Sequence, residues 1–387
     1  MNYELNDNEK KLQLEAAAFT AQEIAPFAAM LDDSPKDAAF KKMVDNLKKL
    51  AKANLLGTGI GDGSIDLVTH YVAGEALAKA CAATFLSARA SAFMCGGLIA
   101  LFGTAAQKQK YLKPLLSAEK VGAVAYTEPE AGSDIASIAT AAQKDGAAWK
   151  LDGVKDIVAN APIADVILVL AWTDKDAGPQ KGMSFFIIEK GAKGLTVGTP
   201  LETLGMRGLP LAAVTLEGCE AKEILGGEPG AGLSQHNKIL SLGTVGITAL
   251  CVGIGASCME KATLHAKTRK SSGRKIGSFQ EVGFKLADMF TMNDLSKMLG
   301  LRAAWGMNRN ENEAEILGAC AKLFASESAT KIANMTMQIF AGHGYIKGSD
   351  AERLYRDAKF GEICEGPSEI QRTIIAKQEL DRYAPQK

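Results

Sequence analysis

The chain has 387 residues, 47% of them hydrophobic, enough for roughly two to three domains with sizeable cores. Its 44 basic and 44 acidic side chains give a formal net charge of zero, which argues against nucleic acid or an anionic membrane surface as a partner. Seven cysteines without a CxxC pair favour reduced thiols and a cytoplasmic protein. The four histidines show no metal-ligand spacing, so no metal site is expected.

Residues 1–121 are predicted to form an all-α domain. The N-terminus is polar and charged, unlike a signal peptide. Apolar residues then recur at helical spacing, and we expect helices over 8–31, 37–56, 66–82, 85–101 and 103–120.

Residues 122–232 change character and predict an antiparallel β domain. Short β-rich runs cover 147–158, 164–173, 183–191, 195–200 and 211–221, separated by turn residues. Within the first run, Asp152-Gly153 is predicted to form a hairpin turn.

Residues 233–387 are predicted to form a four-helix bundle, because long helical patterns cover 233–268, 279–307, 311–341 and 366–381. The apolar stretch 240–262 is rich in glycine and favours a buried core helix, so no membrane insertion is expected. The predicted fold class is therefore α+β and multidomain, in the order α, β, α.

Three stretches have the composition of a binding site. Residues 125–134, AYTEPEAGSD, offer small residues that admit a ligand, together with the hydroxyls of Thr127 and Ser133; a polar turn with helix caps is the alternative. Residues 338–345, QIFAGHGY, resemble part of a dinucleotide loop, but no strand precedes them. They are better interpreted as a helix terminus near a ligand.

The third stretch, RDAKFGEICEGPSEIQ, contains the candidate base. Glu365 follows Ile363 and Cys364 and precedes a Gly-Pro pair. An apolar, turn-constrained setting of this kind raises the pKa of a carboxylate toward neutrality, where a general base is most effective. Taken alone, Glu365 would more often be an ordinary loop residue.

Together these motifs resemble the acyl-CoA dehydrogenase family of flavoproteins. They occur in family order, with TLGMRGLPLAAVTLEGCEAKEILGGEPGAG between the first and second, and the resemblance spans about residues 10–383. It implies FAD-dependent oxidation of an acyl-CoA to the enoyl-CoA, with hydride transfer to flavin N5 and electrons passing to an electron-transfer flavoprotein. Glu365 matches the base that removes the α-proton, and its amide would bind the thioester oxygen beside Gly366.

The resemblance also implies the binding residues and a homotetramer that shares each FAD between subunits. The implied cofactor contacts are Val124, Ala125, Tyr126, Thr127, Gly132, Ser133, Ile157, Ala159, Arg269, Phe279, Gln280, Gln338, Gly342, Pro367 and Glu369. The implied substrate contacts are Ser133, Ser241, Thr244, Cys364, Gly366 and Arg89.

Several positions depart from the family pattern. Ile157 and Ala159 replace a Trp and a Thr beside the flavin, Cys364 replaces a Tyr, and Pro367 replaces a Thr. These changes leave open an enoyl-CoA reductase, a dehydrogenase for a cyclic, aromatic-pathway or dicarboxylic acyl-CoA, and a non-catalytic subunit of the same fold. Arg89 either faces a substrate carboxylate or, as we expect, snorkels to the surface.

Overall fold

The N-terminal part is helical, as predicted. The computed structural model describes residues 4–383, so residues 1–3 and 384–387 of the predicted terminal domains lie outside it. Its elements are α1 (Asp7–Glu23), η1 (Ala25–Phe27), α2 (Ala28–Asp33), α3 (Lys36–Lys52), α4 (Leu67–Ala80), α5 (Ala82–Ala88), η2 (Arg89–Gly96), α6 (Gly97–Phe102), α7 (Ala105–Gln107), η3 (Lys108–Leu112) and α8 (Lys113–Leu116). The segment η2 is π-helical, and such segments are frequent at functional sites.

The middle part is a mostly antiparallel sheet of eight strands within the described residues, in the order β6-β7-β3-β2-β4-β5-β8, with β1 parallel to β4. The strands are β1 (Gly122–Ala125), β2 (Ala141–Asp145), β3 (Ala148–Ala159), β4 (Val166–Trp172), β5 (Met183–Glu189), β6 (Leu195–Val197), β7 (Leu211–Ala221) and β8 (Glu223–Ile224). Short helical turns η4 (Ile135–Ser137), η5 (Ala161–Ile163) and α9 (Pro179–Gly182) connect them.

The sheet packs on both faces. Leu168 and Leu170 of β4 join a core shared with the N-terminal helices and helix α10 (Gly232–Thr268), whereas Ile167 and Val169 pack with Val214 of β7 in a second core. Alternate side chains of one strand point to opposite faces, which explains why β4 is apolar throughout.

The predicted turn at Asp152-Gly153 is wrong. Strand β3 runs through both residues, with an irregularity in its pairing to β7 between Leu151 and Gly153. The hairpin turn instead follows Asp145, where Gly146 has φ +62°. Gly153 is required for space, because a Cβ there would lie 2.3 Å from Oγ1 of Thr140.

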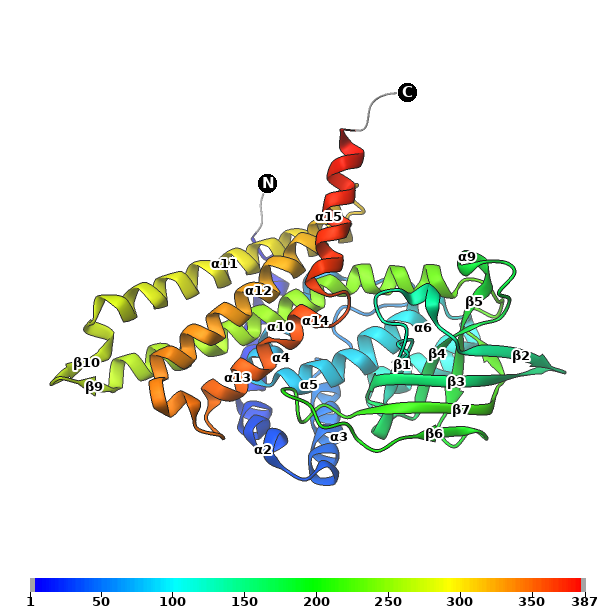
Figure 1. Ribbon diagram of the computed structural model, residues 1–387, viewed down its shortest axis with the longest axis horizontal. Helices are drawn as coiled ribbons and strands as arrows, with labels where there is room; N and C mark the ends of the chain where they lie inside the picture. The colour runs from blue at the N-terminus through cyan, green and yellow to red at the C-terminus, as the bar shows by residue number, and fades with distance from the viewer. Residues whose placement is uncertain (1–3, 384–387) are drawn as a thin grey trace.

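The C-terminal part is helical, as predicted, and Figure 1 shows its long helices running side by side away from the sheet. Helices α10 (Gly232–Thr268), α11 (Gln280–Asn308) and α12 (Ala314–Phe340) pack on one another, and α10 and α11 also pack on α4. Helix α15 (Ser368–Arg382) packs on α12 and projects from the body. Between them lie β9 (Lys270–Ser271), β10 (Arg274–Lys275), η6 (Ile276–Ser278), η7 (Ala341–Tyr345), α13 (Asp350–Ala358) and α14 (Phe360–Ile363).

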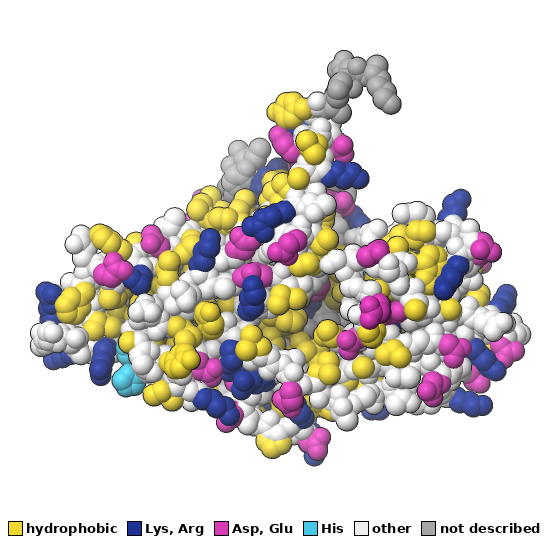
Figure 2. Space-filling view, in the orientation of Figure 1, with side chains coloured by type: hydrophobic (Ala, Val, Ile, Leu, Met, Phe, Trp, Pro, Cys, Tyr) yellow, Lys and Arg dark blue, Asp and Glu magenta, His cyan; other side chains and the backbone are white. Residues whose placement is uncertain are grey.

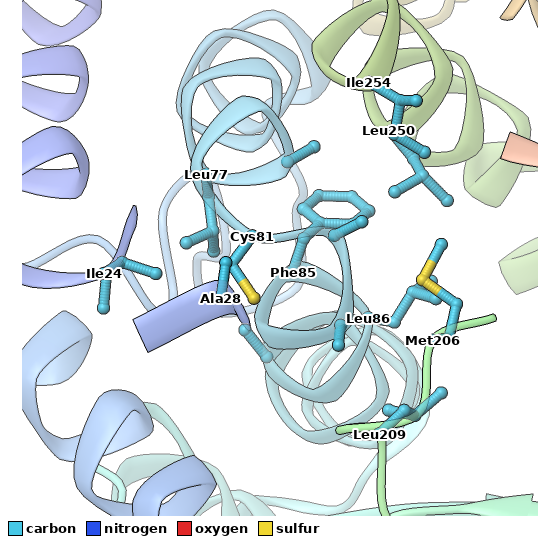
Figure 3. Packing of buried hydrophobic residues seen from close by; sticks show 14 of the residues in the cluster. Ile24, Ala28, Leu77, Cys81, Phe85, Leu86, Met206, Leu209, Leu250 and Ile254 are labelled. Carbon is cyan, nitrogen blue, oxygen red and sulfur yellow. The ribbon is translucent and has the colours of Figure 1, made fainter. Parts of the chain in front are cut away.

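Two helical stretches among the described residues are long and apolar enough to span a membrane, Ala82–Phe102 and Gly232–Thr268, and both are mostly buried inside the protein. Side chains of both stretches form part of the central core. In Figure 3, Phe85 packs toward Leu250 and Ile254 of α10, and Leu86 lies near Met206 from the loop before β7. The three parts of the chain therefore meet around α5 and α10, where the candidate site lies.

Candidate active site

A cavity of about 690 Å³ opens where the sheet, α10 and the segment before α15 meet, a volume in the range of cofactor and ligand pockets. It brings together most of the predicted site residues: Arg89, Val124, Tyr126, Thr127, Gly132, Ser133, Ile157, Ala159, Ser241, Thr244, Cys364, Glu365, Gly366 and Pro367. The motifs that are separate in the sequence thus form one site.

Glu365 lies between α14 and α15 in an unusual backbone conformation. Its φ is +48°, and that of Gly366 is +88°. The carbonyl of Gly366 accepts hydrogen bonds from Lys322 Nζ at 2.7 Å and from Gln371 Nε2 at 3.0 Å. These donors hold the turn in its left-handed form, so the Glu365 side chain lines the cavity, with 13% of its surface exposed.

Arg89 pairs directly with Glu365. Its Nε donates to Glu365 Oε1 at 3.1 Å, its Nη2 donates to Oε2, and the same Nη2 donates to the carbonyl of Gly243 at 3.2 Å. Only 2% of Arg89 is exposed, so the prediction that it snorkels to the surface is wrong. The predicted apolar setting of Glu365 is also wrong, because a buried guanidinium faces it.

The guanidinium lies in a notch on α10 made by two glycines. A Cβ on Gly243 would lie 2.7 Å from both Arg89 Nη2 and Glu365 Oε2, and one on Gly246 would lie 2.7 Å from Arg89 Nη1. On another side, Arg89 lies over the ring of Phe93 at 4.5 Å, and His70 stacks on that ring. Burial and the Arg89 charge lower the pKa of His70 to about 3, so the imidazole is neutral.

The loop after β1 forms another wall of the cavity. Its buried Glu128 accepts hydrogen bonds from the Ala139 amide at 2.6 Å and from Lys155 Nζ at 2.7 Å. This pairing fixes the loop that carries Thr127, Gly132 and Ser133. It also satisfies both buried charges, as burial requires.

Some predicted contacts lie elsewhere. The Ala125 side chain packs in the core on the other face of the sheet, because neighbouring strand residues point to opposite sides. Glu369, in the first turn of α15, is exposed and outside the cavity lining. The remaining five lie near the β9–β10 end of the helical part, away from the sheet in Figure 1: Arg269, Phe279, Gln280, Gln338 and Gly342.

Several site residues were missed by the sequence analysis. His236 lines the cavity and makes an edge contact with the Tyr126 ring at 4.8 Å between centroids, and Gln371 and Lys322 fix the turn at Gly366. The glycine notch had a usable signal, because Gly243 and Gly246 are three residues apart and share one helix face. Lys322 had none, since a lone Lys in a helical pattern reads as a surface residue.

The cavity fits a large ligand with both polar and apolar parts. Among the described residues, four lining side chains have a buried polar atom without a hydrogen-bond partner, namely Arg89 Nη1, Ser241 Oγ, His236 Nε2 and Gln371 Oε1. Buried polar atoms normally have partners, and these four belong to side chains that line the cavity together with apolar groups such as Val124 and Leu240. A flavin with its ribityl chain, or an acyl-CoA, has this combination of surfaces.

Comparison with known families covers nearly the whole chain. Residues 6–119, 123–219 and 230–380 match the models for the N-terminal, middle and C-terminal domains of acyl-CoA dehydrogenases. The chain is 36% identical to the probable acyl-CoA dehydrogenase YngJ of Bacillus subtilis (strain 168), covering 98% of this chain and 100% of that protein. It is 37% identical to the 3-(aryl)acrylate reductase of Clostridium sporogenes, covering 94% and 96%.

Solved structures agree. Butyryl-CoA dehydrogenase from Megasphaera elsdenii superposes with a TM-score of 0.90 at 29% identity, over 98% of this chain and 100% of that one. A chain from work on the electron transferring flavoprotein of Acidaminococcus fermentans gives 0.92 at 32%, over 98% and 100%. The FAD complex of PigA gives 0.89 at 27%, over 99% and 100%. The fold, the cavity and these matches together show that the chain belongs to the acyl-CoA dehydrogenase family and is an FAD-dependent oxidoreductase acting on acyl-CoA.

Proposed function

We propose that the protein oxidises an acyl-CoA thioester to its α,β-enoyl-CoA with Glu365 as the base. The observation that carries this proposal is that the Glu365 side chain lines the same 690 Å³ cavity as β1 and the loop after it. A thioester lying between that loop and Glu365 would present its α-carbon to the carboxylate.

Each residue of the turn has a role in this proposal. A Glu365 carboxylate oxygen takes the α-proton, and the Glu365 amide donates a hydrogen bond to the thioester oxygen, where negative charge develops. Gly366, with φ +88°, gives the backbone the close approach that this contact requires. When bound, FAD supplies the acceptor for the β-hydride.

The proposed cofactor contacts divide between the cavity beside the sheet and the β9–β10 end of the helical part. The wall formed by Val124, Tyr126 and Thr127, with Ile157 and Ala159, fits the flavin ring. Arg269 suits the FAD phosphates, because a guanidinium binds phosphate oxygens bidentately. Since Arg269 lies at the β9–β10 end of the helical part, we propose that it serves the FAD of a partner subunit in a homotetramer.

Anaerobic mixing with a panel of thioesters tests the reaction. Butyryl-, octanoyl-, 3-phenylpropionyl-, cyclohexanecarbonyl- and glutaryl-CoA are mixed in turn with the yellow holoenzyme, and flavin absorbance is followed. At least one thioester should bleach the flavin, and Glu365→Gln should slow that bleaching about 10² to 10⁴-fold while FAD remains bound. Failure of every thioester, or bleaching of the variant at the normal rate, would count against the proposal.

The reverse reaction is the second candidate. The 3-(aryl)acrylate reductase of Clostridium sporogenes, at 37% identity, favours it, as does the loss of the usual Trp and Thr at Ile157 and Ala159. In that direction Glu365 donates its proton to the α-carbon. Reoxidation of the reduced flavin by an enoyl-CoA, faster than bleaching by the corresponding acyl-CoA, would identify a reductase. In either direction we propose an electron-transfer flavoprotein as the redox partner.

A further inference from the structure

We propose that Arg89 is a positioning residue that aims the Glu365 carboxylate and opposes its protonation. This inference rests on the proposed role of Glu365. It concerns a pairing between residues 276 positions apart.

The geometry of the pair favours positioning over substrate binding. Arg89 uses Nε and Nη2 on the two carboxylate oxygens of Glu365, the fork geometry that fixes a carboxylate in one plane. Its remaining Nη1 is buried and points toward Gly246 and the His70 side. No free edge of the guanidinium therefore faces the cavity to take a substrate carboxylate.

The surroundings hold the guanidinium in place. The π-helical segment η2 begins at Arg89, and the side chain lies between the Phe93 ring and the Gly243–Gly246 notch. A longer residue at either glycine would occupy the space of the pair. The site is thus built around an arginine at this position.

The charges around Glu365 are few. Besides Arg89, the titratable or charged groups that face it or share its cavity are Tyr126, Cys364, Lys322, Asp156, His236 and Glu315. Burial is the main reason that the pKa values of Tyr126 and Cys364 are raised, and burial lowers the pKa of His236, so these three are neutral near pH 7. Lys322 is directed to the Gly366 carbonyl, so within residues 4–383 Arg89 is the cation that contacts the carboxylate.

The pairing with Arg89 affects the proton that Glu365 would take from the substrate. In dehydrogenation the α-C–H bond breaks, the proton passes to Glu365, and the β-hydride with its electron pair leaves for the flavin. The neutral carboxyl group then faces a buried cation that has lost its counter-charge, an unfavourable arrangement. Arg89 therefore disfavours the protonated product state on the enzyme and favours return of the proton to carbon.

Two substitutions with different charge test this inference. Arg89→Gln removes the charge, and Arg89→Lys keeps it but loses the fork. In Arg89→Gln, the acid limb of the bleaching rate should move to higher pH, and the extent of bleaching at equilibrium should increase. In Arg89→Lys, the acid limb should stay in place while the rate falls. Lys108→Gln, which removes a cation paired with Asp62 outside the cavity, should change neither quantity.

A measurement without substrate separates this inference from the proposed function. Infrared difference spectra of the free holoenzyme, with Glu365→Gln as reference, follow the carboxylate band of Glu365 against pH. Its loss should occur at higher pH in Arg89→Gln than in the wild type, because the variant lacks the cation that contacts the carboxylate. Coincident titrations would overturn the inference even if the wild type is bleached normally. A wild type that no thioester bleaches overturns the proposed function alone. If Arg89→Gln does not fold, a wild-type rate in Arg89→Lys still overturns the inference.

Discussion

At the scale of single residues, the site concentrates backbone strain at Glu365, the proposed base. A non-glycine residue in the left-handed region costs on the order of 1–3 kcal/mol, and Glu365 adopts it at φ +48°. The cost is offset by contacts on both sides of the residue, from Arg89 to the carboxylate and from Lys322 and Gln371 to the next carbonyl. The strained turn thus depends on buried partners from three other helical segments.

The glycine notch gives a prediction at this scale. Gly243→Ala places a methyl group 2.7 Å from both Arg89 Nη2 and Glu365 Oε2, so the pair must separate. Turnover should fall at least about tenfold, the order of change that small misplacements at an active site cause. The matched control is Gly96→Ala, a buried helical glycine whose added Cβ would meet its nearest neighbour at 3.6 Å.

Steady-state rates and thermal melting of both variants, with FAD bound, decide this prediction. The control should keep the wild-type rate. If Gly243→Ala also keeps it, the notch does not serve the Arg89–Glu365 pair.

Much of the site could be predicted from local sequence, but its electrostatics could not. The motifs around Thr127 and Glu365 contain their own signals, since small residues and a carboxylate beside Gly-Pro are visible in short windows. Arg89 gives no such signal, because a lone arginine on a small apolar helix is compatible with the surface. Only the tertiary fold places it against a residue 276 positions away.

At the scale of elements, the predictions that depend on local hydrophobic pattern were correct, and the turn prediction failed because tertiary contacts decide the conformation there. The long helices and the buried strand β4 follow from hydrophobic pattern alone. Asp152-Gly153 has the composition of a turn, yet Gly153 is there because Thr140 leaves no room for a Cβ. Strands β1 and β2 were not predicted, because sequences such as GAVA are short and rich in small residues, with weak β propensity.

The burial of Asp357, in helix α13, predicts that the stability of the protein depends on pH. Asp357 is buried, accepts a hydrogen bond from the Met206 amide at 2.6 Å, and burial raises its pKa from 3.8 to about 6. The native state therefore binds more protons than the unfolded state between these values, and stability falls as pH rises through about 6. In Asp357→Asn the side chain is neutral throughout and cannot show this loss.

Urea unfolding from pH 4 to 8 measures the effect. Relative to the wild type, Asp357→Asn should gain up to about 3 kcal/mol across this range, with most of the change between about pH 4 and 6 and little above pH 6. A difference that does not vary with pH would contradict the assignment.

At the scale of the whole molecule, apolar surface lies on the helical part, and Figure 2 shows hydrophobic side chains on the projecting α15 and along the neighbouring helices. Phe284, Phe290 and Met298 of α11 are each more than half exposed, at 55%, 60% and 57%, as is Leu380 of α15 at 74%. Exposed groups of this kind mark interfaces. They support the proposed assembly, in which a partner covers this surface.

Mixed assemblies test the shared cofactor site. Glu365→Gln and Arg269→Ala chains are each expected to be nearly inactive alone, the second because it retains FAD poorly. The two variants are dissociated and reassembled together in equal amounts with added FAD. About half of the two-fold subunit pairs are then mixed, and each mixed pair has one intact site out of two. The mixture should therefore recover about a quarter of wild-type activity. Each variant reassembled with itself is the control, and no recovery in the mixture would place both halves of the site in one chain.

The separation of Arg269 from the cavity has a consequence for any assay of this protein. If one subunit completes the cofactor site of another, then diluting the enzyme removes working sites rather than merely spacing them out. Specific activity would fall at low protein concentration and return when free FAD is supplied in excess, so a turnover number has meaning only alongside the concentration at which it was obtained.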